Sequence, residues 1–266
     1  MRPAYTPAWE KEIVIMATIA DKTVLVTGGN RGIGQALVEE ALRRGASRVY
    51  LGTRTPVDHP DGRVTPVALD VTDRGQIQLA VDAVESLDIL INNAGIALYD
   101  DLSDRHVLER HLAVNLFGTY DVTRAFLPLL TRSGGVIVNN LSVNAFAPFP
   151  VIPAYSISKA ALFNLTQSLR ALLAGQGVRV HAVLTGPVDT DMSRDADIPK
   201  SAPETVARGI LDGVEREEED IFPDPMAATM AESWRGGAAK ALEHQYAEIA
   251  GMAVADQGRG VGRDPS

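Results

Sequence analysis

The sequence predicts an α/β fold: a single Rossmann-type domain with a doubly wound parallel sheet of about seven strands and helices on both faces. Short runs rich in β-branched residues alternate along the chain with longer stretches of helical periodicity. The short runs are apolar throughout, which is typical of parallel strands covered on both faces. A Gly-rich turn directly follows the first run, as nucleotide-binding folds of this class require.

Seven short runs are the predicted strands. The third, Arg63–Leu69, contains Pro66, which cannot donate to a strand ladder and therefore indicates an edge or irregular pairing. The other six are Thr23–Thr27, Arg48–Thr53, Leu87–Ile91, Gly135–Asn140, Gly177–Leu184 and the short Asp220–Phe222.

Six longer stretches are the predicted helices. Gly45 follows the first of them as a C-cap. In the second, Ile77, Ala80, Val81 and Val84 share one face, the pattern of an amphipathic helix packed on a sheet. The predicted ranges are Gly32–Arg44, Thr72–Glu85, Arg105–Leu130, Ala154–Ala174, Ala202–Val214 and Pro225–Ala250.

The ends of the chain differ from its middle. Residues 1–16 are predicted to be a disordered leader, because their apolar part is short and flanked by Glu10 and Glu12, unlike a signal peptide. Residues 17–256 are expected to form one dinucleotide-binding and catalytic domain, and residues 257–266 a flexible tail. The apolar stretch Ile13–Ile19 is too short to span a membrane.

Composition excludes several classes of function. The net charge of −9 makes nucleic acid and anionic membrane surfaces poor partners. The chain has no cysteine, so disulfides and thiolate catalysis are impossible, and a reducing, cytoplasmic location is the expectation. The five histidines show no metal-ligand spacing, and we predict no metal.

The Gly-rich turn, Thr27-Gly-Gly-Asn-Arg-Gly-Ile-Gly34, opens the first predicted helix. Glycines allow the backbone to approach a pyrophosphate, and the helix N-terminus offers free N–H groups and a positive dipole end. The alternative is a plain tight connection between a strand and a helix. The order of strand, glycines and helix favours a dinucleotide, with these residues as contacts: Gly28, Asn30, Arg31, Gly32, Ile33 and Gly34.

A second group of polar residues lies downstream. Tyr155 and Lys159 are four residues apart in a predicted helix, so they share a face. Ser142 follows the fifth strand, 13 positions before Tyr155, and Asn115 interrupts an apolar helical run. The alternative is that Tyr155 and Lys159 are a chance pair on the surface, but this would explain neither Ser142 nor Asn115.

Together these motifs resemble the short-chain dehydrogenase/reductase family over most of residues 20–222. The TGxxxGxG turn, the Asn92-Asn-Ala-Gly95 element and the Asn115–Ser142–Tyr155–Lys159 set carry the resemblance. It implies catalytic roles for those four residues, with Asn115 positioning a water behind Lys159. The implied further cofactor contacts are Asp70, Val71, Asn93, Ala94, Gly95, Tyr155, Lys159, Pro187, Val188 and Thr190. Thr185-Gly186-Pro187 reverses the family's usual Pro-Gly order, which puts the backbone contact of Val188 in doubt.

The type of dinucleotide is indicated by Arg54, about 20 residues past the glycines, where an NAD enzyme places an acidic residue. A guanidinium suits the 2′-phosphate of NADP, and Arg31 is a second candidate. The alternative is that both are ordinary surface arginines. We expect NADP(H) to be preferred over NAD(H).

The chemistry of carbonyl reduction fits these residue types. Hydride transfer puts negative charge on oxygen, and Tyr155 is the expected general acid, or base in oxidation. Lys159 is expected to lower the pKa of Tyr155 and to bind the nicotinamide ribose, while Ser142 polarises the carbonyl. The substrate would be a small carbonyl compound, apolar or aromatic, because the segment between Ser142 and Tyr155 is apolar. The expected pocket residues are Asn144, Phe146, Phe149, Ile152, Val188 and Met192.

Two alternatives to a carbonyl reductase remain open. A non-catalytic NADP(H)-sensing protein would use the same fold, although such proteins usually lack one of the four catalytic residues. An epimerase or dehydratase would share the Tyr–Lys pair, but would carry GxxGxxG and a larger C-terminal region. For assembly, a homodimer through the helices Arg105–Leu130 and Ala154–Ala174 is expected, with a tetramer as a further option.

Overall fold

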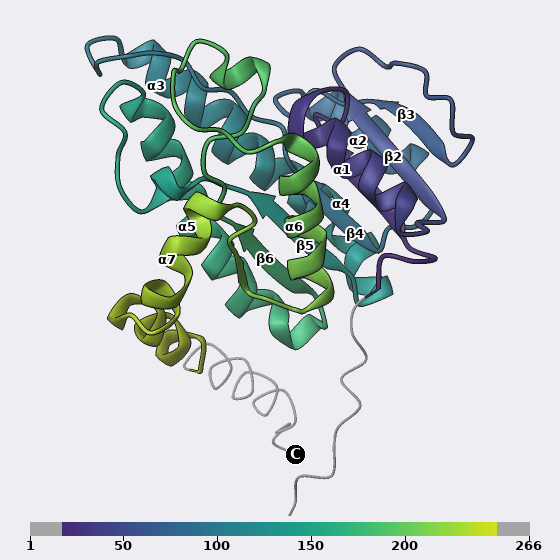
Figure 1. Ribbon diagram of the computed structural model, residues 1–266. Coiled ribbons are helices and arrows are strands. Elements are labelled where there is room, and N and C mark those ends of the chain that lie inside the picture. The colour runs from purple at the N-terminus through teal and green to yellow at the C-terminus, as the bar shows by residue number, and fades with distance from the viewer. Residues whose placement is uncertain (1–17, 249–266) are drawn as a thin grey trace, which may run out of the picture.

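A computed structural model describes residues 18–248 of the chain. Seven parallel strands form one sheet in the order β3-β2-β1-β4-β5-β6-β7, which confirms the predicted doubly wound fold (Figure 1). Pro66 lies in β3 at the edge of this sheet, as expected for a residue without a backbone donor. The strands are β1 (Thr23–Thr27), β2 (Arg48–Thr53), β3 (Val64–Ala68), β4 (Ile89–Asn92), β5 (Val136–Asn140), β6 (Arg179–Val183) and β7 (Asp220–Ile221).

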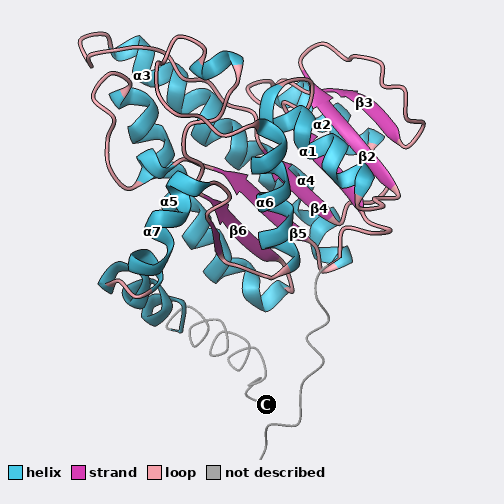
Figure 2. Cartoon of the chain, viewed as in Figure 1, coloured by secondary structure: helices cyan, strands magenta, loops and turns pink. Residues whose placement is uncertain are grey.

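Helices cover both faces of the sheet, as Figure 2 shows. The principal helices are α1 (Gly32–Arg43), α2 (Arg74–Ala83), α3 (Arg105–His111), α4 (Thr119–Ser133), α5 (Pro153–Leu173), α6 (Pro203–Glu215) and α7 (Pro225–Arg235). Short helical turns are η2 (Val143–Ala145), η3 (Ala174–Gln176) and η4 (Asp191–Ser193). A second helical stretch after α7 has its described part in residues 238–248.

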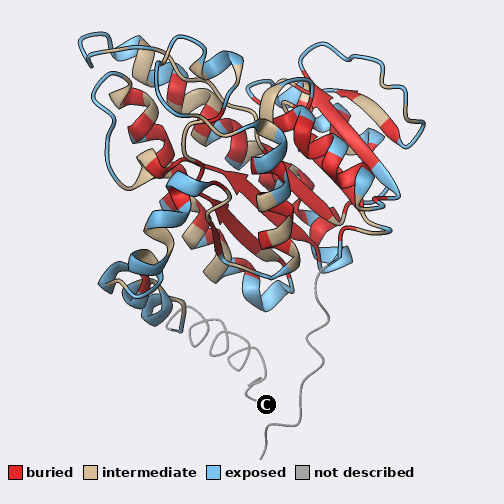
Figure 3. Cartoon of the chain, in the orientation of Figure 1, coloured by how far each residue is buried: buried red, intermediate tan, exposed pale blue. Residues whose placement is uncertain are grey.

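Neighbouring residues of one strand serve opposite halves of the core. On β1, Val24 and Val26 pack with α1 and α6, whereas Leu25 packs with α2, α4 and α5. The strands are accordingly buried along most of their length (Figure 3). This two-sided burial explains why the sequence shows continuous apolar runs.

The predicted helix Arg105–Leu130 is wrong in one respect. Between α3 and α4 the chain forms a π-helical segment, η1 (Leu112–Gly118), and α4 then continues past Pro128 to Ser133. The apolar periodicity of the sequence does not distinguish the two helix types, because a single widened stretch barely disturbs it. Asn115 lies at the centre of this segment.

The predicted helix Pro225–Ala250 is also wrong, because it is two helices. The first ends at Arg235, and Gly236 and Gly237 separate it from the stretch 238–248. Two adjacent glycines lose more backbone entropy in a helix than any other pair, so the break occurs there. The predicted end at Ala250, the leader 1–16 and the tail 257–266 lie outside the described residues.

The last helical stretch is attached to the domain by a compact ionic network. Buried Asp220 on β7 accepts hydrogen bonds from Arg170 of α5 and from Trp234 of α7, each at 2.8 Å. Lys240 lies 2.7 Å from a carboxylate oxygen of Asp220, and Glu243 pairs with both basic residues. The network joins β7, α5 and both C-terminal helices.

Candidate active site

The predicted site residues gather at the carboxyl ends of the strands, where open parallel sheets bind ligands. The Gly-rich turn follows β1, Asn93–Gly95 follow β4, Ser142 follows β5, and Pro187–Thr190 follow β6. Contacts bring these segments together. The position of a Cβ on Gly32 would lie 3.0 Å from Thr190, and one on Gly28 would lie 3.1 Å from Ala94.

Three glycines of the Gly-rich turn stand where a side chain would be strained or would clash. Gly28 and Gly32 have φ of +66° and +53°, in the left-handed region that favours glycine. A Cβ on Gly34 would lie 2.1 Å from the Gly28 carbonyl oxygen. No side chain caps the N-terminus of α1, whereas Asp73 and Asp104 cap α2 and α3. The first N–H groups of α1 are therefore available to a pyrophosphate.

Asn93 holds the turn to the neighbouring strand. Its side-chain nitrogen donates to the carbonyl oxygens of Thr27 and Gly28, at 3.1 and 3.3 Å. The Thr27 hydroxyl accepts from the backbone N–H groups of Asn93 and Ala94, at 2.9 and 3.0 Å. These bonds hold the Gly-rich turn and the segment after β4 in place without the help of a ligand.

Lys159 is buried at the centre of the site. Its ammonium donates to the Asn140 carbonyl oxygen at 2.7 Å and lies 5.6 Å from the centroid of the Tyr155 ring. A Cβ on Gly95 would lie 3.9 Å from the same nitrogen. Burial lowers the pKa of Lys159 to about 8.

The sequence predicts that Lys159, together with the oxidised nicotinamide, lowers the pKa of Tyr155, and in the protein without a cofactor the burial of the phenol acts in the opposite direction. Burial raises the pKa of Tyr155 to about 12, and the Ser142 hydroxyl beside it opposes this shift only in part. Although Tyr155 retains some exposure, the surrounding protein removes most water from its phenol. Burial therefore sets the direction of the shift, and the phenol stays protonated at neutral pH.

Ser142 and Asn115 have defined partners. The Ser142 oxygen accepts from the Asn144 N–H at 3.1 Å, and its hydroxyl lies beside the Tyr155 phenol. Asn115 is fully buried and holds Ile96 on both sides, accepting from its N–H at 2.9 Å and donating to its carbonyl at 3.0 Å. It also donates to the Ser158 hydroxyl at 2.9 Å.

The residues expected at the adenosine end lie at the carboxyl ends of β2 and β3. Arg54 is exposed, and its charge contributes to the lowered pKa of Asp70, whose main cause is the Thr72 N–H bond. Val71 is buried. Arg31 is also exposed and pairs with Asp191 at 3.5 Å, which places it against the loop after β6.

The six expected substrate residues differ in their exposure and in their contacts. Phe149 and Met192 are exposed, Asn144 and Ile152 are half-buried, and Val188 is buried. Phe146 instead stacks on Trp234, with ring centroids 4.6 Å apart, and meets Phe163 edge-on. Phe146 thus anchors the loop after Ser142 to α7.

Two site features were missed by sequence reasoning. His111, fully buried, lies edge-on to the Tyr155 ring, and Asn140 accepts the Lys159 ammonium on its backbone oxygen. The doubled asparagine that ends an apolar strand was the available signal for Asn140, since polar residues at buried strand positions need partners.

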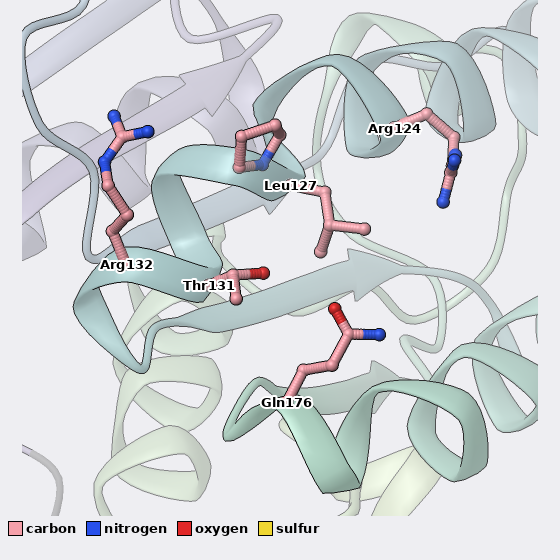
Figure 4. A pocket seen from close by; sticks show the side chains of 6 residues that line it. Arg124, Leu127, Thr131, Arg132 and Gln176 are labelled. Atoms are coloured by element: carbon pink, nitrogen blue, oxygen red, sulfur yellow. The ribbon is translucent and has the colours of Figure 1, made fainter. Parts of the chain in front are cut away.

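A pocket of the described residues lies elsewhere, with a volume of about 590 Å³ (Figure 4). Its lining side chains come from α4 and η3, at the amino-end edge of the sheet opposite the site. They are Arg124, Leu127, Pro128, Thr131, Arg132 and Gln176. Among residues 18–248, no group of three or more His, Asp or Glu side chains could hold a metal ion. No helix in that range is long and apolar enough to cross a membrane.

The family follows from a comparison with known proteins. A family profile described as short chain dehydrogenase matches residues 22–200. The chain belongs to the short-chain dehydrogenase family. A relative, 2-(S)-hydroxypropyl-CoM dehydrogenase 3 of Xanthobacter autotrophicus, is 35% identical over 208 residues, which cover 71% of this chain and 81% of the relative.

Solved structures of the family agree with the fold. A short-chain dehydrogenase from Burkholderia cenocepacia in complex with NADP superposes with a TM-score of 0.79 at 35% identity, covering 86% of this chain and 98% of that one. A 3-ketoacyl-(acyl-carrier-protein) reductase of Brucella melitensis, complexed with NADH, superposes with a TM-score of 0.69 at 23% identity, covering 79% and 94%. This short-chain dehydrogenase is therefore an oxidoreductase by family, with the fold of both neighbours.

Proposed function

We propose that this short-chain dehydrogenase reduces a ketone or aldehyde to an alcohol with NADPH. The observation that carries the proposal is the placement of Lys159: buried, bonded to the Asn140 carbonyl, and 5.6 Å from the Tyr155 ring beside Gly95. The uncapped α1 N-terminus, the glycine turn and this buried cation suit a dinucleotide. When bound, the reduced nicotinamide supplies the hydride.

The protein's own residues would handle the proton. Tyr155 holds its phenolic proton at neutral pH and would donate it to the carbonyl oxygen. Ser142, whose hydroxyl lies beside the phenol, would polarise the same oxygen. The Lys159 ammonium would stabilise the phenolate that remains and so lower the pKa of Tyr155 during the reaction. Asn115 would position a water behind Lys159.

The preference for NADP(H) over NAD(H) is part of the proposal. Arg54 is exposed near Asp70, so its guanidinium is accessible to a 2′-phosphate. The Burkholderia neighbour contains NADP, which supports this preference, whereas the more distant Brucella reductase contains NADH. The exposed apolar side chains Phe149 and Met192, with Val188, favour an apolar or aromatic substrate.

The proposal is tested by following NADPH and NADH oxidation against aromatic and aliphatic ketones, aldehydes and β-ketoesters. Turnover with NADPH is expected, and Tyr155→Phe should abolish it while leaving NADPH binding intact. Tyr246→Phe, at an exposed position, is the matched control and should retain activity. Binding of NADPH without turnover of any carbonyl would favour a non-catalytic sensor, and faster turnover with NADH would refute the role of Arg54.

We further propose a cytoplasmic homodimer, with residues 17–256 as one domain. The exposed apolar side chains Phe117 and Tyr120 on the α4 side and Leu172 on α5 support a subunit contact through these helices. Light scattering should give twice the chain mass of 28.4 kDa, and Phe117→Glu should shift the assembly toward the monomer. An unchanged mass in the variant would place the contact elsewhere.

A further inference from the structure

Asn140 ends β5 on the face of the sheet opposite its neighbour Asn139. Asn139 is bonded to Asn92 at 2.9 Å and to Thr166 of α5 at 3.0 Å, so it faces the α4 and α5 layer. Side chains alternate along a strand, and Asn140 therefore faces the other way, toward the Gly-rich turn. Its side-chain nitrogen donates to the Asn93 side-chain oxygen at 3.0 Å.

The orientation of the Asn140 amide is fixed by its partner. Asn93 uses its nitrogen on two carbonyl oxygens, those of Thr27 and Gly28, and a carbonyl can only accept. The Asn93 side-chain oxygen must therefore be the acceptor toward Asn140, and the Asn140 side-chain nitrogen must be the donor. It follows that Oδ1 of Asn140 is the atom turned away from Asn93.

This Oδ1 atom is buried and has no hydrogen-bond partner. The whole residue is only 8% exposed. Among residues 18–248, only two other buried side-chain atoms share this condition, on Asn92 and His181. The backbone oxygen of the same residue accepts a hydrogen bond from the Lys159 ammonium at 2.7 Å. A buried acceptor without a donor is costly, so a donor that arrives with a ligand would be favoured.

Asn140 thus connects the two halves of the site. The nitrogen of its amide is bonded to Asn93, which holds the Gly-rich turn. Its backbone carbonyl oxygen accepts a hydrogen bond from the Lys159 ammonium. Lys159 in turn adjoins Gly95, because a Cβ there would lie 3.9 Å from its nitrogen. A ligand that reaches from the glycines to Lys159 would pass this amide.

We propose that Asn140 is a further cofactor-binding residue, whose Oδ1 accepts a hydrogen bond from a donor on the nicotinamide nucleoside half of the dinucleotide. This inference rests on the proposed function, because it requires that a nicotinamide dinucleotide binds here. The donor is of one chemical kind, a ribose hydroxyl or carboxamide N–H, and the adenine half does not supply it.

Binding of two ligands separates this role from a general disturbance of the site. Dissociation constants are measured by calorimetry for NADPH and for adenosine 2′,5′-bisphosphate, which lacks the nicotinamide half. Asn140→Leu should weaken NADPH binding about 10-fold, as loss of one buried hydrogen bond predicts, and leave the bisphosphate within twofold. Asn164→Leu, the same change at an exposed position of α5, should alter neither.

Stability supplies a second measurement. The melting temperature of unliganded Asn140→Leu should stay within a few degrees of the wild type, since a partnerless acceptor is removed along with one bond. If Asn140→Leu does not fold, Asn140→Ser, which is smaller than the native side chain, is measured in the same way. Equal loss of both ligands, or no loss of NADPH affinity, would overturn the inference while leaving the proposed reductase intact. A wild-type protein that binds neither ligand would refute the proposed function and the inference with it.

Discussion

The His111 ring meets the Tyr155 ring edge-on, with centroids 6.4 Å apart and planes at 71°. The Leu98 N–H can only donate, so the His111 Nε2 accepts it, at 3.0 Å. Nδ1 then carries the proton and donates to the Val107 carbonyl at 2.8 Å. His111 is therefore a neutral imidazole that ties the loop after β4 to the end of α3 and packs against the Tyr155 ring.

His111→Phe keeps a ring against Tyr155 but leaves the Leu98 N–H without its acceptor. We expect the free energy of unfolding to fall by about 1–3 kcal/mol, the cost of a buried unpaired donor. Urea denaturation measures this loss. His106→Phe, exposed on the same helix, is the control and should be nearly neutral. A loss no larger than the control's would mean that the Leu98 N–H is satisfied without His111.

Lys159 should make stability depend on pH. Its pKa is lowered to about 8 from 10.5, so between these values the unfolded chain binds more protons than the folded one. Stability then rises as pH increases, by about 2 kcal/mol between pH 8 and pH 10. Tyr155 has the opposite sign, but its window lies between pH 10 and about 12.

The contribution of Lys159 is isolated by comparison with Lys159→Met. Urea midpoints at pH 8, 9 and 10 should show the wild type gaining stability relative to the variant as the pH rises. Other titrating groups cancel in that difference. A pH-independent difference would show that Lys159 titrates at its ordinary value.

Gly34→Ala should disrupt the cofactor turn. Its Cβ would lie 2.1 Å from the Gly28 oxygen and 2.6 Å from the Asn93 side-chain nitrogen, so the backbone must move. We expect a loss of about 3 kcal/mol of stability, at the upper end for overpacking, and weakened NADPH binding. Gly62→Ala is the matched control, because nothing lies within 4 Å of the new methyl group. Wild-type NADPH affinity in Gly34→Ala would contradict the assigned role of the turn.

Arg54→Asp should change the cofactor preference. Loss of a charge-assisted bond to the 2′-phosphate should raise the NADPH dissociation constant 10- to 100-fold, which corresponds to roughly 1.5–3 kcal/mol of binding free energy. The constant for NADH should change little. Arg132→Asp, the same charge change at the far end of α4, controls for the overall field. Equal weakening in both variants would refute a direct contact by Arg54.

Much of the fold could be predicted from the sequence, because strands that are buried on both faces are apolar along most of their length. The exceptions have physical causes. The π-helical segment keeps nearly the same side-chain spacing as an α-helix, and the break at Gly236 and Gly237 depends on backbone entropy rather than on periodicity.

The residues of the candidate site could be named from motifs, but their electrostatics could not. The sign of the pKa shift of Tyr155 depends on how much water the folded chain removes, which no spacing reveals. Phe146 was expected to face the substrate, and instead stacks on Trp234, a residue 88 positions away. The contacts of Asn140 and His111 could not be predicted, because their hydrogen-bond partners, Asn93 and Leu98, are not adjacent in sequence.

The π-helical segment also has a consequence for comparing sequences. A widened stretch accommodates an additional residue as a bulge, so the helical turns on either side of it keep nearly the same phase. Deleting a single residue within Leu112–Gly118 would return the segment to a regular α-helix and leave α3 and α4 almost unrotated relative to each other. Relatives with a regular helix here should therefore align with a one-residue gap, and that gap would mark the widened turn around Asn115 rather than a shift of α4.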